Sequence, residues 1–333
     1  MSIPPLAMCR NLIVDAIVQM PLYRYRGDER LEPGALLTQP DPDTIGAATI
    51  GATVDDLLFH GRAYWQVIGR DPEGFPRAAR WQPHGNVQPE VKDHGGGYAE
   101  LKGYRIDGER GVVPADDVLR FDSPNPGVLD VGGPALLAAL DLEQAARRLA
   151  SVELPAGVIQ AESGSDISPD DAALMVDEFQ ATRRINGIAY LQGATYSREQ
   201  LSPADLQLVE ARAQVATDCA RLCSVPVSMI GASPTGGASA MLYANLGSQL
   251  ALFVSSACAV HYHTIEATLS TPQATPRGQR VAFDVQAFLR SDPEAAAKYA
   301  IDLEAAGLID RNEARALLGI PAAPSPDLQP GRV

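Results

Sequence analysis

The chain has 333 residues, of which 46% are hydrophobic and 20% charged, so it is long enough to bury more than one hydrophobic core. Its net charge of −14 argues against a protein that grips phosphate backbones through a general basic surface. We expect no standard secretion signal, because Pro4 and Pro5 interrupt the first apolar residues, and no membrane span, because polar residues interrupt the charge-free run over 222–265.

The N-terminal third is predicted to contain two helices followed by short strands. Apolar residues recur at helical spacing over 9–20, and Pro21 ends that helix. A second helix is predicted over 44–60, closed by Gly61. From 63 to 121 the pattern changes to β-type runs separated by glycine-rich turns, which predicts a small β-rich unit. The predicted strands are 63–68, 78–82, 87–91, 98–101, 104–106 and 118–121.

The middle of the chain carries two predicted helices that flank an insert. Pro134 follows two glycines, at a position where a first-turn proline is tolerated, which predicts a helix from there to about residue 152. A Ser-Pro start signal at 202–203 predicts the second helix, which carries a narrow seam of mostly small residues. Within the insert we expect a helix beginning at 168–171 and a strand over 188–191. The seam consists of Leu206, Val209, Ala213, Ala216 and Ala220.

The last third is predicted to be mostly helical. A loop of small residues leads into a helix over 241–269 that carries no charged residue before Glu266. A Ser-Asp-Pro-Glu start signal at 291–294 predicts another helix, which Gly307 ends. Asp310, with Glu313 three residues later, forms a capping-box pattern that predicts a short final helix.

A serine esterase is the one catalytic alternative that the sequence offers. His94 and the three glycines after it match an oxyanion-hole element of some esterases. That mechanism also needs a Gly-x-Ser-x-Gly elbow, and the candidate around Ser233 lacks the closing glycine. No Asp or Glu lies between Ser233 and His261, so the required order of acid and histidine is broken. A glycine-rich turn is the simpler interpretation of the histidine motif.

Nucleotide and metal sites are not predicted either. Gly231 and Gly236 have the glycine spacing of a phosphate-binding loop, but glycine and alanine stand where Lys and Ser or Thr are needed. His261 and His263 lie near Cys258, yet two positions on a helix separate the histidines by roughly 160°. We therefore expect no cofactor, no metal and no enzymatic activity.

The pattern of the cysteines and of the acid pairs indicates structural roles. No CxxC spacing is present, and the cysteines lie mostly in helical apolar patterns, which predicts buried reduced thiols without disulfides. The paired acids are interpreted as helix starts or solvated turns. The cysteines are Cys9, Cys219, Cys223 and Cys258, and the acid pairs stand at 55–56, 116–117 and 170–171.

Three sequence motifs follow one another in a fixed order. Residues 206–212 have the sequence LQLVEAR, residues 225–231 have VPVSMIG, and residues 306–315 have AGLIDRNEAR. In this order they resemble the Q-L-x-E-x-R helix, the V-P-x-x-x-x-G turn and the C-terminal G-x-x-x-x-N-E-x-R signature of phage portal proteins of the siphophage head-tail type. Further similarity lies at 9–24, 36–42, 61–76 and 113–121, while Cys223 and Ser224 replace the family's usual phenylalanine.

The resemblance implies an α+β portal fold that assembles as a ring, which in the family has twelve copies. Each part of that fold is assigned by similarity to a stretch of this sequence. The parts would be the wing at 1–131 with N-terminal helices and the β-rich unit, stem helix 1 at 132–152, the clip at 153–205, stem helix 2 at 206–231, the tunnel loop and long helix at 232–271, the wing return strand at 272–290, a short helical crown at 291–321, and a flexible tail at 322–333.

The resemblance also implies which residues meet which partners. The tunnel loop would face double-stranded DNA, the seam would pack the stem, and acidic and basic pairs in the clip would dock other proteins. The expected partners are further copies of the chain, DNA passing non-specifically through the channel, the terminase large subunit, the head-tail connector, and the major capsid and scaffolding proteins. The tunnel-loop residues are Ser233, Thr235, Gly236, Gly237 and Ser239, and the clip residues are Asp170, Asp171, Arg183 and Arg184.

The physical chemistry of the sequence agrees with this expectation. A duplex that slides through a ring is held by every Lys or Arg that neutralises a phosphate, so a charge-free lining reduces drag. The resemblance implies a virion protein at the capsid portal vertex, assembled in the host cytoplasm. Another head-tail connector or minor capsid protein is the structural alternative, the serine esterase is the weaker enzymatic one, and a prophage remnant fits the same sequence.

Overall fold

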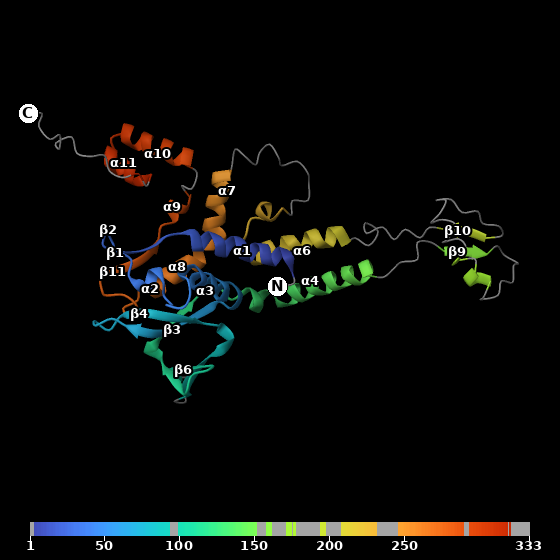
Figure 1. Ribbon diagram of the computed structural model, residues 1–333, viewed down its shortest axis with the longest axis horizontal. Helices are drawn as coiled ribbons and strands as arrows, with labels where there is room; N and C mark the ends of the chain where they lie inside the picture. Colours follow the sequence, from blue (N-terminus) through green and yellow to red (C-terminus); the bar gives the residue numbers. More distant parts are fainter. Residues whose placement is uncertain are drawn as a thin grey trace, which may run out of the picture. The chain divides into compact units, whose positions relative to one another are not determined.

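The computed structural model describes residues 3–93, 99–151, 158–161, 171–174, 176–177, 194–197, 208–231, 246–289, 293–318 and 320. The chain divides into two compact units. Unit 1 comprises Met1–Pro134 and Ala216–Val333, and unit 2 comprises Ala135–Val215. Helices and small antiparallel sheets mix along the chain (Figure 1), which confirms the mixed helix and sheet class.

Two N-terminal helices pack against each other in unit 1. Helix α1 (Pro4–Gln19) has proline at its start, where no backbone N–H is needed, and it begins earlier than the sequence pattern predicts. Helix α3 (Gly46–His60) packs against α1. The predicted end at Gly61 is confirmed, because this glycine adopts a left-handed φ of 67° and its N–H bonds to the Leu57 carbonyl at 3.0 Å.

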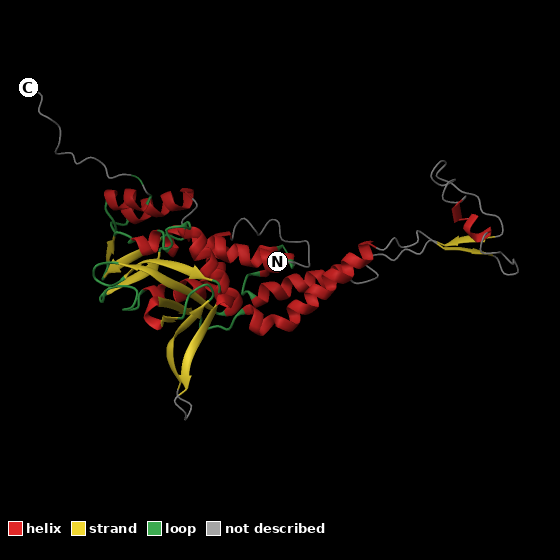
Figure 2. Ribbon diagram, turned by 60° about the horizontal axis from the view of Figure 1, so that its bottom comes forward, coloured by secondary structure: helices red, strands yellow, loops and turns green. Residues whose placement is uncertain are grey.

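Three three-stranded antiparallel sheets accompany these helices. The predicted β-rich unit is confirmed, although two of its predicted strands, 98–101 and 104–106, form one continuous strand, β6. Figure 2 shows the β5–β6 hairpin projecting beyond the other strands of unit 1. The first sheet has the order β11-β1-β2, with β11 (Gln279–Phe283), β1 (Leu22–Arg26) and β2 (Glu29–Leu31); the second β4-β3-β8, with β4 (Pro76–Gln82), β3 (Arg62–Arg70) and β8 (Val118–Asp122); the third β5-β6-β7, with β5 (Val87–Asp93), β6 (Ala99–Ile106) and β7 (Val112–Pro114).

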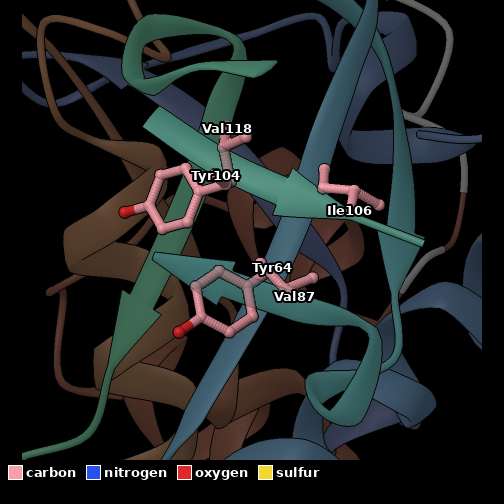
Figure 3. Packing of buried hydrophobic residues seen from close by; sticks show 5 residues of the cluster. All are labelled: Tyr64, Val87, Tyr104, Ile106 and Val118. Atoms are coloured by element: carbon pink, nitrogen blue, oxygen red, sulfur yellow. The ribbon is translucent and has the colours of Figure 1, made fainter. Parts of the chain in front are cut away.

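Short elements connect these strands: helix α2 (Ala35–Thr38) follows β2, the 3-10 helix η1 (His84–Asn86) follows β4, and η2 (Ala115–Asp117) precedes β8. A cluster of buried side chains holds the second and third sheets together. Tyr64 of β3 meets Tyr104 of β6 edge to face, with ring centroids 5.6 Å apart. Trp65, on the opposite face of β3, is fully buried, and its Nε1 donates to Thr53 Oγ1 of α3 at 2.7 Å. Figure 3 shows the cluster, which consists of Tyr64, Val87, Tyr104, Ile106 and Val118.

Helix α4 (Val128–Ser151) begins six positions before the predicted start, so the prediction that Pro134 occupies the first turn is wrong. The N–H groups of Asp130 and Val131 already bond to the Gly127 carbonyl, which starts the helix there. Gly133 has no Cβ to clash with the ring of Pro134, which reduces the usual penalty for a helical residue before proline. The helix therefore continues through both glycines and Pro134.

Unit 2 contains most of α4, a two-stranded antiparallel sheet and the first half of α6 (Leu208–Leu222). Its strands, β9 (Val158–Ala161) and β10 (Ala194–Ser197), were not predicted from the sequence. Residues 171–174 are helical, within the helix predicted from 168–171, and the strand predicted over 188–191 lies outside the described residues.

The helix predicted over 241–269 is described from Leu246 onward. It consists of α7 (Leu246–Phe253), a π-helix η5 (Val254–Cys258) and α8 (Ala259–Leu269), and a short 3-10 helix, η3 (Val227–Ile230), precedes it. Strand β11 and helix α9 (Val285–Leu289) follow. Among the described residues, no helix combines the length and apolar character needed to cross a bilayer.

Two short helices end the described chain, α10 (Pro293–Ala305) and α11 (Arg311–Leu317). Gly307 has a φ of 70° and closes α10, as predicted. The capping box is confirmed, because the Asp310 N–H donates to Glu313 Oε2 and the Glu313 N–H donates to Asp310 Oδ1, both at 2.7 Å.

Candidate functional site

The candidate site is the charge-free segment, which contains no Asp, Glu, Lys or Arg from 222 to 265. The structure describes its two flanks, 222–231 and 246–265. The part between them, 232–245, lies outside the described residues. That part includes all the predicted loop residues, Ser233, Thr235, Gly236, Gly237 and Ser239.

The first flank, residues 222–231, forms a tight turn at the end of α6. Ser224 adopts a φ of 55°, a left-handed conformation that few residues other than glycine take without strain. The N–H of Val225 bonds back to the Ala220 carbonyl at 2.9 Å, which caps the helix. Pro226 then precedes η3, and Gly231, with a φ of 70°, ends it. The left-handed Ser224, the ring of Pro226 and the left-handed Gly231 therefore restrict the path of the backbone after α6.

A side-chain hydrogen bond joins the second flank, residues 246–265, to the first. Ser256, within the π-helix η5, donates its hydroxyl to the Ser224 carbonyl at 3.1 Å. Helix α1 packs against both η3 and η5. A π-helix inserts an extra residue into a helical turn and is frequent at functional sites. Both described flanks of the segment therefore rest on the same helix and on each other.

The described surface of this segment combines small and apolar residues. Ser248, Ala251, Leu252 and Ser255 are exposed, and Phe253 is buried on the opposite side. These exposed side chains offer hydroxyl groups and methyl groups but no formal charge. Such a surface can contact an anionic polymer without forming ion pairs to its phosphates.

The two histidines of α8 lie in different environments, as their spacing predicts. His261 is buried and lines a small pocket of about 60 Å³, and its Nδ1 has no hydrogen-bond partner. Burial lowers the pKa of His261 to about 4, so this ring is neutral. His263 is exposed, with its Nδ1 2.8 Å from Glu266 Oε2. No group of three potential metal ligands exists within the described residues.

The four cysteines are buried and free, which confirms the predicted buried thiols. Cys223 at the end of α6 lies beside Cys9 of α1, and this neighbour lowers the pKa of Cys9. Burial raises the pKa of Cys219 to about 11 and that of Cys258 to about 12. A thiol with a raised pKa is a poor nucleophile, so these side chains act in packing.

The acid pair at 55–56 is neither a helix start nor a solvated turn, so the interpretation from the sequence is wrong for this pair. Both residues lie in the second half of α3, where Asp55 forms an ion pair with Arg10 of α1. Asp56 is buried and accepts hydrogen bonds from Trp81 Nε1 at 2.9 Å and from the His84 N–H at 3.2 Å. Burial raises the pKa of Asp56 to about 6. The sequence pattern missed this role because Trp81 and His84 follow α3 in another element.

A separate feature of interest is the pair of helices that leads into and out of the insert. Within unit 2, Arg212 Nη2 of α6 donates to Glu143 Oε2 of α4 at 2.8 Å. Of the predicted seam, Ala213 is exposed, Ala216 is partly buried and Ala220 is fully buried. Asp171 is exposed. Leu206, Asp170, Arg183 and Arg184 lie outside the described residues, as does the side chain of Val209.

A family profile and several solved structures are similar to this chain. The profile of the family described as phage portal protein matches residues 4–319. The crystal structure of an HK97-family phage portal protein from Corynebacterium diphtheriae is similar, with 24% identity, a TM-score of 0.58, and coverage of 88% of this chain and 96% of that one. No curated protein matches the sequence.

Two structures of gene transfer agent particles share the fold. A chain in the virion of a native particle is 20% identical, with a TM-score of 0.68. A chain in the neck of a native particle, computed with C12 symmetry, is 21% identical, with a TM-score of 0.65. Each match covers 96% of this chain and 91% of the other.

Proposed function

The chain belongs to the phage portal protein family, and from this membership we propose that its copies form a ring at one capsid vertex through which DNA enters and leaves. The family match spans 4–319, which favours a portal over another head-tail connector or minor capsid protein. The proposed role is structural and non-catalytic. It requires a passage, a wall of repeated subunits and surfaces for other proteins.

Ring assembly is supported by the similar chain from a particle neck with C12 symmetry. A ring needs head-to-tail contacts between different surfaces of neighbouring copies, with a rotation that closes. Three apolar residues of α4 are exposed, on different faces of the helix, and contacts with neighbouring copies would cover part of this apolar surface. They are Leu129, Val131 and Leu137.

The described elements support the proposed parts of the ring. Strand β11 pairs with β1, which joins the proposed wing return to the N-terminal wing. Helices α4 and α6 lead into and out of 153–205, as stem helices around a clip would. The short helices α10 and α11 correspond to the proposed crown.

The charge-free segment is the observation that carries the proposed DNA passage. Its described flanks are fixed to α1 and to each other, and their exposed side chains are uncharged. A duplex that moves in both directions must not be held at each phosphate, and the absence of Lys and Arg from 222–265 avoids that hold. The net charge of −14 adds repulsion that keeps a duplex centred.

Further partners follow from this role and are part of the proposal. The clip, with Asp171 exposed on its surface, would dock the terminase large subunit during packaging and a head-tail connector afterwards. The wing would meet the major capsid and scaffolding proteins. We propose the virion as the site of the mature ring, after assembly in the host cytoplasm.

Native mass spectrometry and electron microscopy of the purified full-length chain test the proposal. We expect closed rings with a central hole wide enough for a duplex, in vitro or in virions, and a mass that is a whole multiple of the chain mass. A protein that stays monomeric at all concentrations and is absent from purified particles would contradict ring assembly.

A further inference from the structure

Two histidines from different elements of unit 1 stack on each other. His60 is the last residue of α3, and His84 is the first residue of η1, the short helix that precedes β5. Their ring centroids are 4.4 Å apart, and the two ring planes differ by only 6°. Both side chains are partly shielded from solvent. The stack therefore connects the end of α3 to the start of the β5–β6 hairpin.

His84 is also held by polar and aromatic neighbours. Asp56, about one helical turn before His60, accepts hydrogen bonds at Oδ2 from the His84 N–H at 3.2 Å and from Trp81 Nε1 at 2.9 Å. The ring of Tyr64 stacks on that of His84, with centroids 6.0 Å apart. The position of His84 therefore depends on α3, β3 and β4 together.

The other charged groups nearby are already in ion pairs. Arg62 of β3 is paired with Asp122 of β8, and Asp55 of α3 is paired with Arg10 of α1. The titratable or charged groups that face His84 from the packed elements are His60 and Asp56 of α3, and Arg62 and Tyr64 of β3.

A proton on His84 is disfavoured in the stacked geometry. Burial lowers the pKa of His84, the neighbouring His60 lowers it further, and Asp56 opposes both. Nδ1 of His84 is buried and has no hydrogen-bond partner among the described residues, so an N–H at that atom would meet no acceptor. His60, by contrast, ends α3, where the last carbonyls of the helix stabilise a positive charge. Because two charged rings this close repel each other, the stack accommodates one charge but not two.

We propose that the His60–His84 stack is a proton-sensitive contact that holds the start of the β5–β6 hairpin on α3 at neutral pH and releases it in acid. With at most one ring charged, the rings stay stacked. When both rings are protonated, their repulsion and the unpaired Nδ1–H of His84 separate them. The buried cluster around Tyr64 still holds the strands, so the release takes the form of more frequent local opening of β5 and β6. This inference does not depend on ring assembly.

Hydrogen exchange of the full-length protein, followed by mass spectrometry, tests this contact. Exchange of backbone amides in peptides that cover β5 and β6 is measured at about pH 5 and about pH 7.5 and divided by the intrinsic rate at each pH. Since the ordinary pKa of histidine is 6.5 and that of stacked His84 is lower, the contact weakens as pH falls below 6.5. We expect the corrected exchange to be at least about tenfold faster at the lower pH. Equal corrected exchange at the two pH values would overturn the proposal.

Variants assign the pH effect to the stack. His84→Phe and His60→Phe keep a flat ring but remove one site of protonation, so each should reduce the change in exchange of β5 and β6 to within about threefold. His263→Gln is the matched control, because His263 is exposed on α8 and lies beside Glu266, and it should retain the wild-type change. If His84→Phe does not fold, His60→Phe is sufficient, since either ring can be the one left uncharged. A full pH effect in His60→Phe would refute the proposal.

Asp56→Asn separates the stack from the buried carboxyl beside it. Burial raises the pKa of Asp56 to about 6, so its ionisation weakens the junction as pH rises, which is the opposite sense to the stack. Asp56→Asn should therefore keep the faster exchange of β5 and β6 in acid, and loss of the effect would identify the carboxyl as the sensor and overturn the proposal. Peptides from α1 are the internal reference. If their exchange accelerates by the same factor, the chain is unfolding globally, and the local contact is not the cause.

Discussion

At the residue scale, two buried titratable groups in unit 1 oppose each other in their dependence on pH. Asp56 has a raised pKa of about 6, and His261 has a lowered pKa of about 4, both because of burial. Each group is neutral in its preferred folded form. Their signs differ because an acid becomes charged as pH rises, whereas a histidine becomes charged as pH falls.

We predict that Asp56→Asn abolishes the decrease in the free energy of unfolding that ionisation of Asp56 causes as pH rises. The folded pKa of Asp56, about 6, lies above its ordinary value of 3.8, so the wild type loses stability as pH rises from about 4 to 6. The loss approaches about 2–3 kcal/mol once both states are ionised. Thermal unfolding from pH 4 to 8 should show the Asn variant gaining stability relative to wild type as pH rises.

We predict the reverse slope for His261→Gln. The unfolded histidine takes up a proton below its ordinary pKa of 6.5, while the folded one resists protonation down to about 4. The wild type therefore loses stability as pH falls through this window, by about 3 kcal/mol at most. In the same thermal assay the Gln variant should gain on wild type as pH falls. Parallel slopes for the two variants would contradict the assignment whose predicted sign they do not follow.

The sequence predicted the environment of the histidines but not that of Asp56. The positions of His261 and His263 two apart on one helix require different faces, so local geometry was sufficient. Asp56 is buried because Trp81 and the backbone of His84 reach it from another element. No spacing within α3 carries that information, since the contact exists only after the helix packs on the sheet.

At the element scale, glycines fix where helices start and how closely elements approach. Gly127 precedes α4, and a Cβ there would stand 2.3 Å from the Phe59 carbonyl oxygen and 2.6 Å from the His60 backbone. Backbone atoms cannot yield as the end of a flexible side chain can. The close approach of α3 and α4 therefore depends on this one missing methyl group.

We predict that Gly127→Ala destabilises the protein by about 3 kcal/mol, because the added Cβ forces α3 and α4 apart. Gly85→Ala is the control, since Gly85 has a negative φ and open space around its Cα. It should be neutral or stabilising by up to about 1 kcal/mol. Thermal or chemical unfolding measures both, and similar losses would rule out the close-contact explanation.

Element boundaries were predictable where a local hydrogen-bonding motif sets them. The closing glycine Gly61 and the Asp310 and Glu313 capping box needed no tertiary information. The start of α4 and the strands β1 and β2 were missed. In β1, tyrosines alternate with arginines, a pattern without apolar alternation, and its neighbour β11 lies far away in sequence. The loop residues that were predicted to meet DNA stay a prediction.

At the scale of the whole molecule, the proposed passage depends on low affinity for phosphates. We predict that Thr235→Arg and Ser239→Arg slow DNA packaging, because each adds a cation that neutralises a phosphate and is repeated around the ring. Packaging of phage DNA in vivo, or in a reconstituted system, measures the effect. Thr44→Arg, at an exposed position before α3, is the matched control and should leave the packaging rate unchanged. Unaffected packaging in the two loop variants would place that loop away from the DNA.

The pairing of β1 with β11 has a consequence for the way the chain is made. Leu22 lies opposite Phe283, so the first sheet of unit 1 cannot close until the ribosome has released most of the polypeptide. Until then one edge of β1 has no strand to pair with. Other ribosomes on the same mRNA hold nascent copies nearby, and their strands can pair with this edge. Nascent copies are therefore most exposed to aggregation late in translation, and a chain truncated before residue 279 should be insoluble.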